Sequence, residues 1–178
     1  MIKLKKLVIF LPVLLFPTHL YAGESPIDCL TKNIYFEAKN QSIAGQIAVA
    51  LVVLNRVKDK RFPNTICAVI YEGPTYESWK TRQIPDLPKE SRKYYPRRDR
   101  CQFSWYCDGM ADDVHSEDEK IYNRIKDLAE LAMIPTVKLL DITDGATHYH
   151  ADYVKPEWAK TKTRTIEIGD HIFYRWEK

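Results

Sequence analysis

The longest apolar stretch of the chain predicts a buried helix in its N-terminal third. Residues 47–54 are all apolar, so every face of a helix over this stretch would be hydrophobic, as is typical of a helix inside a core. Ser42 precedes the run, and its hydroxyl can accept a hydrogen bond from a free backbone N–H group at the start of the helix. We expect this central helix to extend to about Asp59.

Three other segments carry weaker helical signals. Their boundaries are indicated by polar residues that can cap a helix and by prolines that interrupt one. The expected helices are residues 29–36, which lead to Glu37; residues 64–71, with Asn64 as the cap; and residues 116–134, which open with the capping-box pair Ser116 and Glu119 and continue with an amphipathic spacing.

The pattern changes in the C-terminal part of the chain. The pair Asp144 and Gly145 is a turn signal. Residues 147–154, 163–168 and 171–176 alternate in polarity or are rich in β-prone side chains, which predicts strands. Together these patterns predict an α+β fold that is mostly helical, with a small antiparallel β-sheet at the C-terminal end.

The first 22 residues have the pattern of a secretory signal peptide. Three lysines form a basic start, residues 7–16 are a short apolar run, and Ala22 offers a small residue for cleavage. The apolar run is shorter than the ~20 residues that a membrane-spanning helix needs, so we favour a cleaved signal over an uncleaved anchor. We therefore expect an exported chain, in the periplasm or outside the cell, with residues 23–178 as a single domain.

Loss of the signal peptide changes the charge of the chain. The full sequence has 27 Lys and Arg against 24 Asp and Glu. The signal contains three lysines and no acid, so residues 23–178 carry 24 residues of each sign. A chain without net charge gives no support to nucleic-acid binding, which depends on neutralising phosphates.

Four cysteines, Cys29, Cys67, Cys101 and Cys107, all lie in the part that is expected to be exported. An even number in an oxidising compartment predicts disulfide bonds, with three possible pairings. Zinc binding is the alternative, but no C-x-x-C pair is present and the spacing does not resemble a zinc framework. If Cys29 bonds across the fold, the bond would hold the segment that carries Glu37.

Glu37 is the candidate catalytic residue. It stands just before the central helix, so its carboxyl group is expected to be partly removed from water, which raises a carboxyl pKa. An acid that is still protonated near neutral pH suits general acid catalysis, and cleavage of a glycosidic bond needs such a donor. The alternative is a glutamate at a helix end that only caps the helix or meets solvent.

Several short motifs follow one another between residues 29 and 174. They are residues 37–41 (EAKNQ), 45–50 (GQIAVA), 55–57 (NRV), 62–67 (FPNTIC), 101–105 (CQFSW), 145–150 (GATHYH) and 168–174 (IGDHIFY). In this order they resemble the cell wall hydrolases related to the spore cortex-lytic enzyme. The resemblance implies a lysozyme-like fold, cleavage of peptidoglycan glycan strands, and Glu37 as the catalytic acid. The chain departs from many relatives at Gln41, where they carry a second glutamate; because Gln cannot titrate, a second catalytic carboxylate is excluded at that position.

Seven further residues are candidates for binding the substrate. Aromatic faces pack on sugar rings, and amide and hydroxyl groups bond to N-acetyl and hydroxyl groups. Phe103 could instead be a core residue, facing the same side of a strand as Trp105. Gln46 and Arg56 are polar groups in the buried helix and need partners: Gln46 could orient the loop after Glu37, and Arg56 could pair with an acid. The seven candidates are Gln46, Gln102, Phe103, Ser104, His148, Tyr149 and His150.

A metal site is the alternative use of the histidines. His148 and His150 would lie on one face of a strand, where Asp152 and His171 could join them as ligands. Such a site would suit a metal-dependent peptidoglycan peptidase. No H-E-x-x-H motif is present, and histidines two positions apart more often make structural or substrate hydrogen bonds. We therefore expect no metal and no cofactor.

Residues 72–100 are rich in proline and charge and predict a long loop without regular structure. Loops of this length in a domain are often functional. Between positions 80 and 100, eight basic residues face three acidic ones. A solvated loop is the favoured interpretation of this charge, and a surface that meets anionic cell-wall polymer is the alternative.

These observations favour a monomeric enzyme that cleaves peptidoglycan strands between N-acetylmuramic acid and N-acetylglucosamine. With one local carboxylate we favour lytic transglycosylation, in which a single glutamate donates a proton and then accepts one. Hydrolysis by a muramidase, which needs a second acid or an activated water, is the runner-up. A metal-dependent peptidase and a non-catalytic wall-binding protein are less favoured functions. We expect glycan strands as the partner, no nucleic acid, and no stable membrane insertion.

Overall fold

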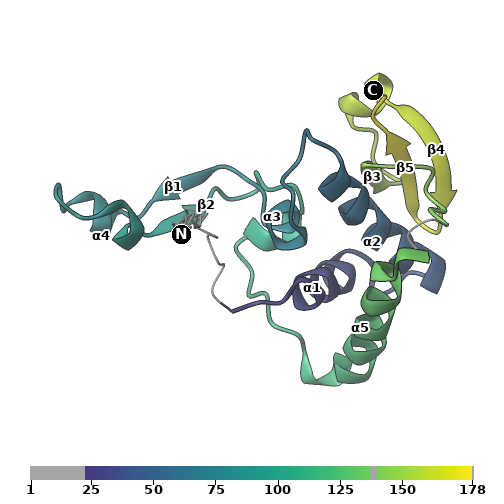
Figure 1. Ribbon diagram of the computed structural model, residues 1–178, viewed down its shortest axis with the longest axis horizontal. Coiled ribbons are helices and arrows are strands. Elements are labelled where there is room, and N and C mark those ends of the chain that lie inside the picture. The colour runs from purple at the N-terminus through teal and green to yellow at the C-terminus, as the bar shows by residue number, and fades with distance from the viewer. Residues whose placement is uncertain (1–22, 137–139, 178) are drawn as a thin grey trace, which may run out of the picture.

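The structure, a computed structural model, describes residues 23–136 and 140–177, and the predicted signal peptide lies outside them. Figure 1 shows a group of helices in the middle of the molecule, a small β-sheet on one side, and a long hairpin arm on the other. The predicted class is confirmed: the fold is α+β and mostly helical, with an antiparallel sheet near the C-terminus. None of the helices in the described residues is long and apolar enough to cross a membrane.

The first helix, α1 (Pro26–Ala38), begins with a capping box that the sequence patterns above do not include. Ser25 Oγ accepts a hydrogen bond from the backbone N–H of Asp28, and the Asp28 carboxylate accepts one from the backbone N–H of Ser25. Pro26 follows in the first turn, where a missing N–H group costs nothing. α1 is longer than expected, so Glu37 lies within its last turn rather than after it.

The predicted central helix is α2 (Ile43–Lys58). Ser42 caps it as expected, because its Oγ accepts a hydrogen bond from the backbone N–H of Gly45. Residues 48–54 are each at most 2 % exposed, so this part of the helix is enclosed on all sides, as its all-apolar sequence predicts.

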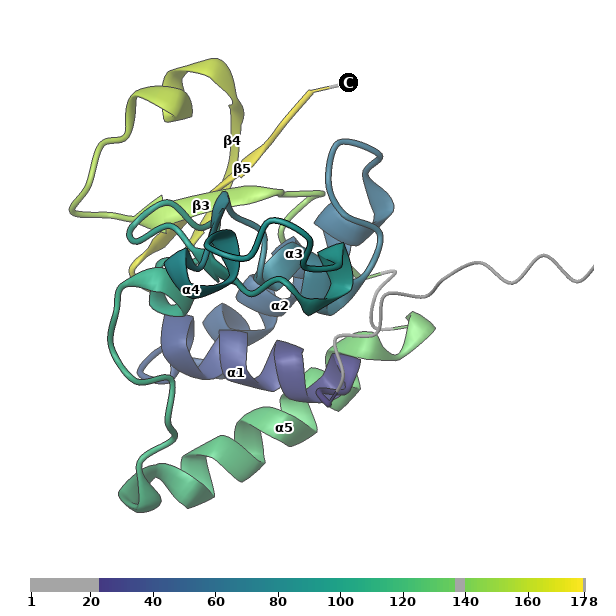
Figure 2. The ribbon, with the colours of Figure 1, turned by 90° about the vertical axis from the view of Figure 1, so that its left-hand side faces the viewer.

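The main core lies between helices. Figure 2 shows α1 next to α2, to the short α3 (Ile66–Ile70) and to α5 (Glu119–Met133), and these helices contact one another. Their apolar faces meet in one cluster of buried side chains, in which each fully buried large residue contributes about 1.5–3 kcal/mol. The cap of α3 was predicted wrongly: Thr65, rather than Asn64, accepts the hydrogen bond from the backbone N–H of Ala68.

The capping box predicted for α5 is also wrong. Ser116 forms part of a 3-10 turn, η3 (Ser116–Asp118), and makes no cap hydrogen bond. Asp118 instead accepts hydrogen bonds from the Tyr35 hydroxyl at 2.6 Å and from Lys39 Nζ at 2.8 Å. A tertiary contact with α1 therefore occupies the carboxylate at the start of α5.

The C-terminal sheet forms where it was predicted. β3 (His148–Ala151), β4 (Thr163–Ile168) and β5 (His171–Arg175) are antiparallel and lie in the order β3-β5-β4, with the 3-10 turn η4 (Glu157–Thr161) between β3 and β4. Phe173 on β5 is fully buried against Ala48 and Val52 of α2, in a second small core. β3 lies beside the C-terminal end of α1, where Tyr149 hydrogen-bonds Glu37.

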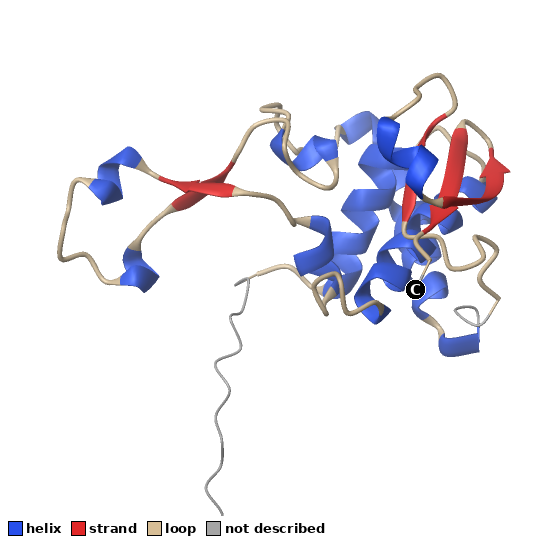
Figure 3. Ribbon diagram, turned by 90° about the horizontal axis from the view of Figure 1, so that it is seen from above, coloured by secondary structure: helices blue, strands red, loops and turns tan. Residues whose placement is uncertain are grey.

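The predicted loop at residues 72–100 is wrong for most of its length. Residues 74–97 form a hairpin arm in which β1 (Thr75–Glu77) pairs with β2 (Tyr94–Pro96), and α4 (Trp79–Arg82) and η1 (Lys89–Ser91) make its tip (Figure 3). One ion pair lies within the arm: Arg92 Nη1 donates to Glu77 Oε1 at 2.8 Å, and Arg92 Nε donates to the carbonyl of Leu87. Composition indicated an irregular loop because it does not record such internal pairs.

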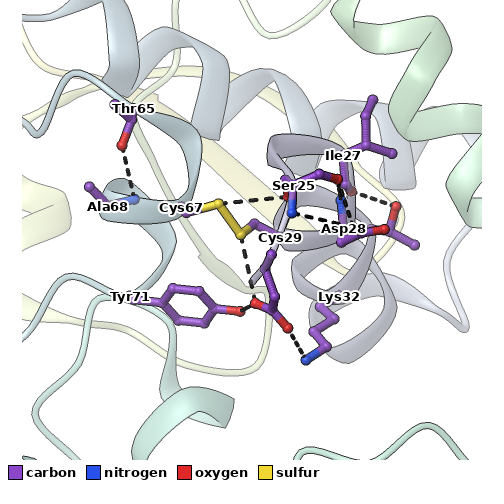
Figure 4. Close-up of a disulfide and its surroundings, with 11 residues drawn as sticks. Ser25, Ile27, Asp28, Cys29, Lys32, Thr65, Cys67, Ala68 and Tyr71 are labelled. Carbon is purple, nitrogen blue, oxygen red and sulfur yellow. Dashed lines mark hydrogen bonds and ion pairs between the residues drawn. A yellow bond between two sulfur atoms is a disulfide. The ribbon is translucent and has the colours of Figure 1, made fainter. Parts of the chain in front are cut away.

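All four cysteines form disulfides, Cys29–Cys67 and Cys101–Cys107. The first joins α1 to α3 across 38 positions of sequence. Figure 4 shows Cys29–Cys67 beside Tyr71 and Lys32, which both hydrogen-bond Glu24. Cys29 thus bonds to a distant part of the fold, which anchors the helix that carries Glu37.

Candidate active site

Glu37 is partly buried on the last turn of α1, facing the small sheet. Its Oε2 accepts a hydrogen bond from the hydroxyl of Tyr149 on β3 at 2.8 Å. Burial raises the pKa of the Glu37 carboxyl, and the Tyr149 hydrogen bond and the positive charge of Arg56 offset only part of that rise. This raised pKa is the property that the sequence analysis expected of a proton donor.

Arg56 supplies a buried positive charge to the same region. It lies on α2, is 5 % exposed, and donates from Nε to the carbonyl of Thr147 at 2.7 Å. Its guanidinium lies over the ring of Phe103 at 5.1 Å. Arg56 makes no ion pair with an acid of the described residues, contrary to expectation, and its Nη1 is buried without a hydrogen-bond partner among them. Its charge acts through space on two acids, Glu72 and Glu37.

Glu72 is the acidic residue that sequence reasoning missed. It follows α3, at the base of the hairpin arm, and its Oε2 is buried without a hydrogen-bond partner in the described part of the chain. Burial raises the pKa of the Glu72 carboxyl, and the charge of Arg56 lowers it in part. Glu72 stood at the edge of a presumed loop, and only the fold brings it and Glu37 near one arginine.

A buried amide holds the loop that follows Glu37. Gln46 was predicted to bind substrate, but it is fully buried and cannot reach a glycan, so that prediction is corrected. Its Nε2 lies 3.2 Å from the carbonyl oxygens of Ala38 and Lys39 and 3.3 Å from that of Gln41, and donates to this group. Carbonyls at a helix end need such donors, so Gln46 has the loop-orienting contacts considered for it.

The departure at Gln41 has a structural explanation. Its Nε2 donates to Asp170 Oδ2 at 2.9 Å, and its Oε1 accepts from the Asp170 backbone N–H at 3.2 Å. A glutamate would lose the donor and place two carboxylates together, so an amide suits this position. The neighbouring Gly169 has a φ of +57°, and an added Cβ would collide with Gln41 Oε1.

In the motif around Gln102, two polar residues are exposed to solvent and one aromatic residue is buried. The segment ends in a 3-10 turn, η2 (Ser104–Cys107), rather than forming a strand. Phe103 is 2 % exposed, so its predicted contact with sugar is corrected and the core alternative holds. Gln102 and Ser104 are exposed and stay candidates for contact with substrate.

His148 and His150 lie on one face of β3, as alternation requires, and both are engaged by neighbours. The His148 ring packs against Trp158 at 5.4 Å, and burial, followed by nearby cations such as Arg56, lowers the pKa of His148 to about 3. His150 Nε2 lies 3.0 Å from the hydroxyl of Tyr174. Within residues 23–136 and 140–177, no three His, Cys, Asp or Glu side chains are grouped so that they could hold a metal ion.

A hollow of about 910 Å³ lies away from Glu37, beside the C-terminal end of α2 and the end of β5. Asn55, Arg61 and Trp176 are among its lining residues, and Glu37 is not. Arg61 is engaged by Asp59 there. Glu37 stays the candidate for the proton donor, because a proton donor is defined by the surroundings of its carboxyl group rather than by the size of a nearby hollow.

Comparison with known proteins assigns the chain to a family. The family model described as Cell Wall Hydrolase matches residues 40–174, which is more than half of the sequence. The chain belongs to the cell wall hydrolase family. The matched region contains Arg56, Glu72 and Tyr149, and it begins three residues after Glu37. The role of Glu37 therefore depends on its local geometry and on the motif that it opens.

Curated relatives of this cell wall hydrolase carry one name. The spore cortex-lytic enzyme of Bacillus cereus is 27% identical over 152 residues, which are 85% of this chain and 44% of that protein. The enzyme of the same name from Bacillus subtilis strain 168 is 34% identical over 71 residues, 40% of this chain and 23% of that protein. The chain spans less than half of the length of these relatives.

Solved structures of the family show the same fold. The catalytic domain of the germination-specific lytic transglycosylase SleB from Bacillus anthracis has a TM-score of 0.53 and 27% identity, covering 86% of this chain and 98% of that one. The catalytic domain of the Bacillus cereus SleB protein has a TM-score of 0.53 and 25% identity, covering 86% and 94%. These likenesses support the expected lysozyme-like, helix-rich architecture.

Proposed function

We propose that this protein is an exported lytic transglycosylase that cleaves peptidoglycan glycan strands between N-acetylmuramic acid and N-acetylglucosamine. The observation that carries the proposal is the setting of Glu37: a partly buried carboxyl group with a raised pKa, hydrogen-bonded by Tyr149 and facing the charge of Arg56. The name of the Bacillus anthracis relative, a germination-specific lytic transglycosylase, supports the reaction class.

The first step uses Glu37 as an acid. Its protonated carboxyl group donates the proton to the glycosidic oxygen, and the bond from that oxygen to the anomeric carbon of the muramyl sugar breaks as positive charge develops on the sugar. Glu37 is left as a carboxylate. The Tyr149 hydroxyl and the Arg56 charge stabilise this anion, so they make the proton easier to release in an otherwise desolvating site.

The second step uses the same residue as a base. The Glu37 carboxylate accepts the proton of the muramyl 6-hydroxyl, and the oxygen of that hydroxyl bonds to the anomeric carbon to close a 1,6-anhydro ring. No water is consumed, and Glu37 is protonated again for the next cycle. One carboxyl group is therefore enough for this reaction, in agreement with the amide at Gln41.

Two exposed positions would contact the sugars around this acid. Gln102 and Ser104 offer an amide and a hydroxyl group for N-acetyl and ring hydroxyl groups. His150 points to the opposite face of β3 from Tyr149, and both of its ring nitrogens lie within hydrogen-bond distance of Ala151 and Tyr174, so we assign it no sugar contact. In this proposal Tyr149 serves Glu37 directly rather than the sugar.

Hydrolysis is the second candidate, and Glu72 is the observation that favours it. A muramidase needs a second carboxylate as a nucleophile or as a base for water. Glu72 has a buried, unpartnered oxygen in the described structure and is coupled to the same arginine as Glu37. If water rather than the 6-hydroxyl attacks the sugar, Glu72 is the residue that we expect to activate it.

Mass spectrometry of the soluble products released from purified sacculi tests both candidates. The parent protein is compared with Glu37→Gln and with Glu117→Gln, a matched change at an exposed glutamate. Anhydro-muramyl products from the parent and Glu117→Gln, and none from Glu37→Gln, are the expected result. Reducing muramyl ends that disappear in Glu72→Gln would establish the hydrolase instead. Cleaved peptides on intact glycan, sensitive to a chelator, would overturn both and favour a metal-dependent peptidase.

A further inference from the structure

The hairpin arm is a built element with its own register. β1 and β2 pair Tyr76 with Tyr95, and the ladder continues past both strands: the Ser78 backbone N–H donates to the Lys93 carbonyl at 2.7 Å, and the Arg97 backbone N–H donates to the Pro74 carbonyl at 2.8 Å. Figures 1 and 3 show this ribbon extending away from the helices and the sheet.

One face of the ribbon carries aromatic rings between cations. Side chains two positions apart in a strand point to the same face, and directly paired residues share a face. Tyr76 and Tyr95 therefore lie together, with ring centroids 6.0 Å apart, and Lys93 and Arg97 flank Tyr95 on the same face. We name these four residues the ribbon face.

The ribbon face is open to solvent. Tyr76 is 49 % exposed and Tyr95 is 48 % exposed, and Lys93 and Arg97 are also exposed. Neither of the two cations has an acidic partner within ion-pair distance among the described residues. The acid of this ribbon, Glu77, points to the opposite face, where Arg92 neutralises it. The face is thus apolar in its middle and positive at both ends.

The base of the arm adjoins the candidate active site. The backbone N–H of Gln102 donates to the carbonyl of Glu72 at 2.9 Å, so the two strands of the arm leave the body from the segments that carry these residues. Gly73 lies so close to Cys101 that an added Cβ would be 2.9 Å from its Sγ. A long polymer bound near Glu72 can therefore continue onto the ribbon.

We propose that the ribbon face binds the glycan strand of peptidoglycan outside the catalytic site, which rests on the proposed function. The apolar faces of sugar rings pack on Tyr76 and Tyr95. The carboxylates of the peptides that the muramyl sugars carry pair with Lys93 and Arg97. A polymer of sugars with regularly attached acids offers apolar ring faces and carboxylates along one chain. These are the two kinds of group that the ribbon face can bind. The arm thereby holds the substrate near Glu37 and raises its effective concentration there.

Binding and cleavage are measured separately, so that failure of this proposal differs from failure of the proposed function. Full-length protein carrying Glu37→Gln is sedimented with purified sacculi from which phosphate-containing wall polymers have been stripped. In this background we test two double variants. One carries Lys93→Gln and Arg97→Gln, and the other carries Tyr76→Ser and Tyr95→Ser. The control pair, Lys89→Gln with Arg82→Gln at the exposed tip, removes the same charge. Thermal unfolding checks each variant.

We expect each ribbon-face pair to weaken binding by about tenfold or more, equivalent to about 1.4 kcal/mol, and the tip control to leave binding unchanged. The charge pair should also reduce the dependence of binding on salt. If the tyrosine pair lowers the unfolding temperature, the charge pair alone decides. Equal binding by the ribbon-face and tip variants would overturn the proposal. Binding that is lost when the sacculi are stripped, or that is as tight to DNA or to anionic lipid vesicles, would also overturn it.

Discussion

The Tyr149→Phe variant tests whether the environment of Glu37 controls a catalytic proton. The change removes the hydroxyl that donates to Glu37 Oε2 at 2.8 Å and keeps the ring. A hydrogen bond to a charged group contributes about 1.5–3 kcal/mol, and one pKa unit corresponds to about 1.36 kcal/mol. Because this hydrogen bond favours the carboxylate, its loss should raise the pKa of Glu37 by about one to two units.

The assay is the pH dependence of kcat/KM for release of soluble glycan from sacculi. Activity that requires protonated Glu37 falls on the alkaline side of the profile as the free enzyme loses that proton. In Tyr149→Phe this alkaline limb should move up by about one to two pH units. Tyr153→Phe is the matched control, since Tyr153 is 83 % exposed, and its profile should coincide with that of the parent. An alkaline limb that stays in place or moves down in Tyr149→Phe would refute the reasoning.

Three further predictions concern stability. Burial keeps the native pKa of Glu37 above its unfolded value, although the Tyr149 hydrogen bond and the Arg56 charge lower it in part. The contribution of this carboxyl group to stability is therefore fully present below the unfolded pKa and is lost as pH rises through the native pKa. Glu37→Gln should be more stable than the parent at pH 7, by up to about 1.4 kcal/mol for each pH unit of that net rise, and equal to it below about pH 4, as measured by thermal unfolding at both pH values. Gly169→Ala combines a left-handed backbone with a Cβ that would displace Gln41 Oε1 from its hydrogen bond with the Asp170 backbone N–H, and it should lose about 1–3 kcal/mol in denaturant unfolding. Gly109→Ala is also at positive φ but meets only the exposed side chain of Arg98, and it should lose less; equal losses would contradict the role given to the turn at Gly169. Replacing Cys29 and Cys67 by serine opens a loop of 38 positions and should lower the free energy of unfolding by about 4 kcal/mol, with an unfolding temperature that no longer responds to reductant at that bond.

Sequence patterns identified the parts of the fold that depend on local chemistry. The apolar run of α2 and the alternation in β4 and β5 mark their elements because helix and strand periodicity is a property of neighbouring residues. Helix caps were less predictable. Ser42 was predicted correctly, but Thr65 rather than Asn64 caps its helix. Ser116 was predicted wrongly, and Asp118 beside it makes a tertiary hydrogen bond instead. A cap depends on which of several polar groups the folded chain leaves free.

The candidate site likewise contains a residue that the sequence could identify and others that only the structure could place. Glu37 could be found from its motif, since a carboxyl group next to so apolar a helix loses much of its contact with water. Gln46 and Phe103 matched the same motifs, yet both are buried, because a motif records which residues occur together and not which side of the backbone faces solvent. Glu72 carried no signal of its own.

The sequence by itself determined the class of fold, the order of the main helices and of the C-terminal strands, the presence of disulfide-forming cysteines and the candidate acid at Glu37. Only the tertiary structure decided which cysteines pair, that a charged, proline-rich stretch forms an arm with an aromatic face, and that Arg56, Tyr149 and Glu72 surround or adjoin the site of Glu37. The physical reason is the distance along the chain over which each interaction acts. Periodicity, capping and desolvation next to an apolar run act between neighbours along the chain, whereas pKa values and pairings depend on distances between residues that only folding brings together.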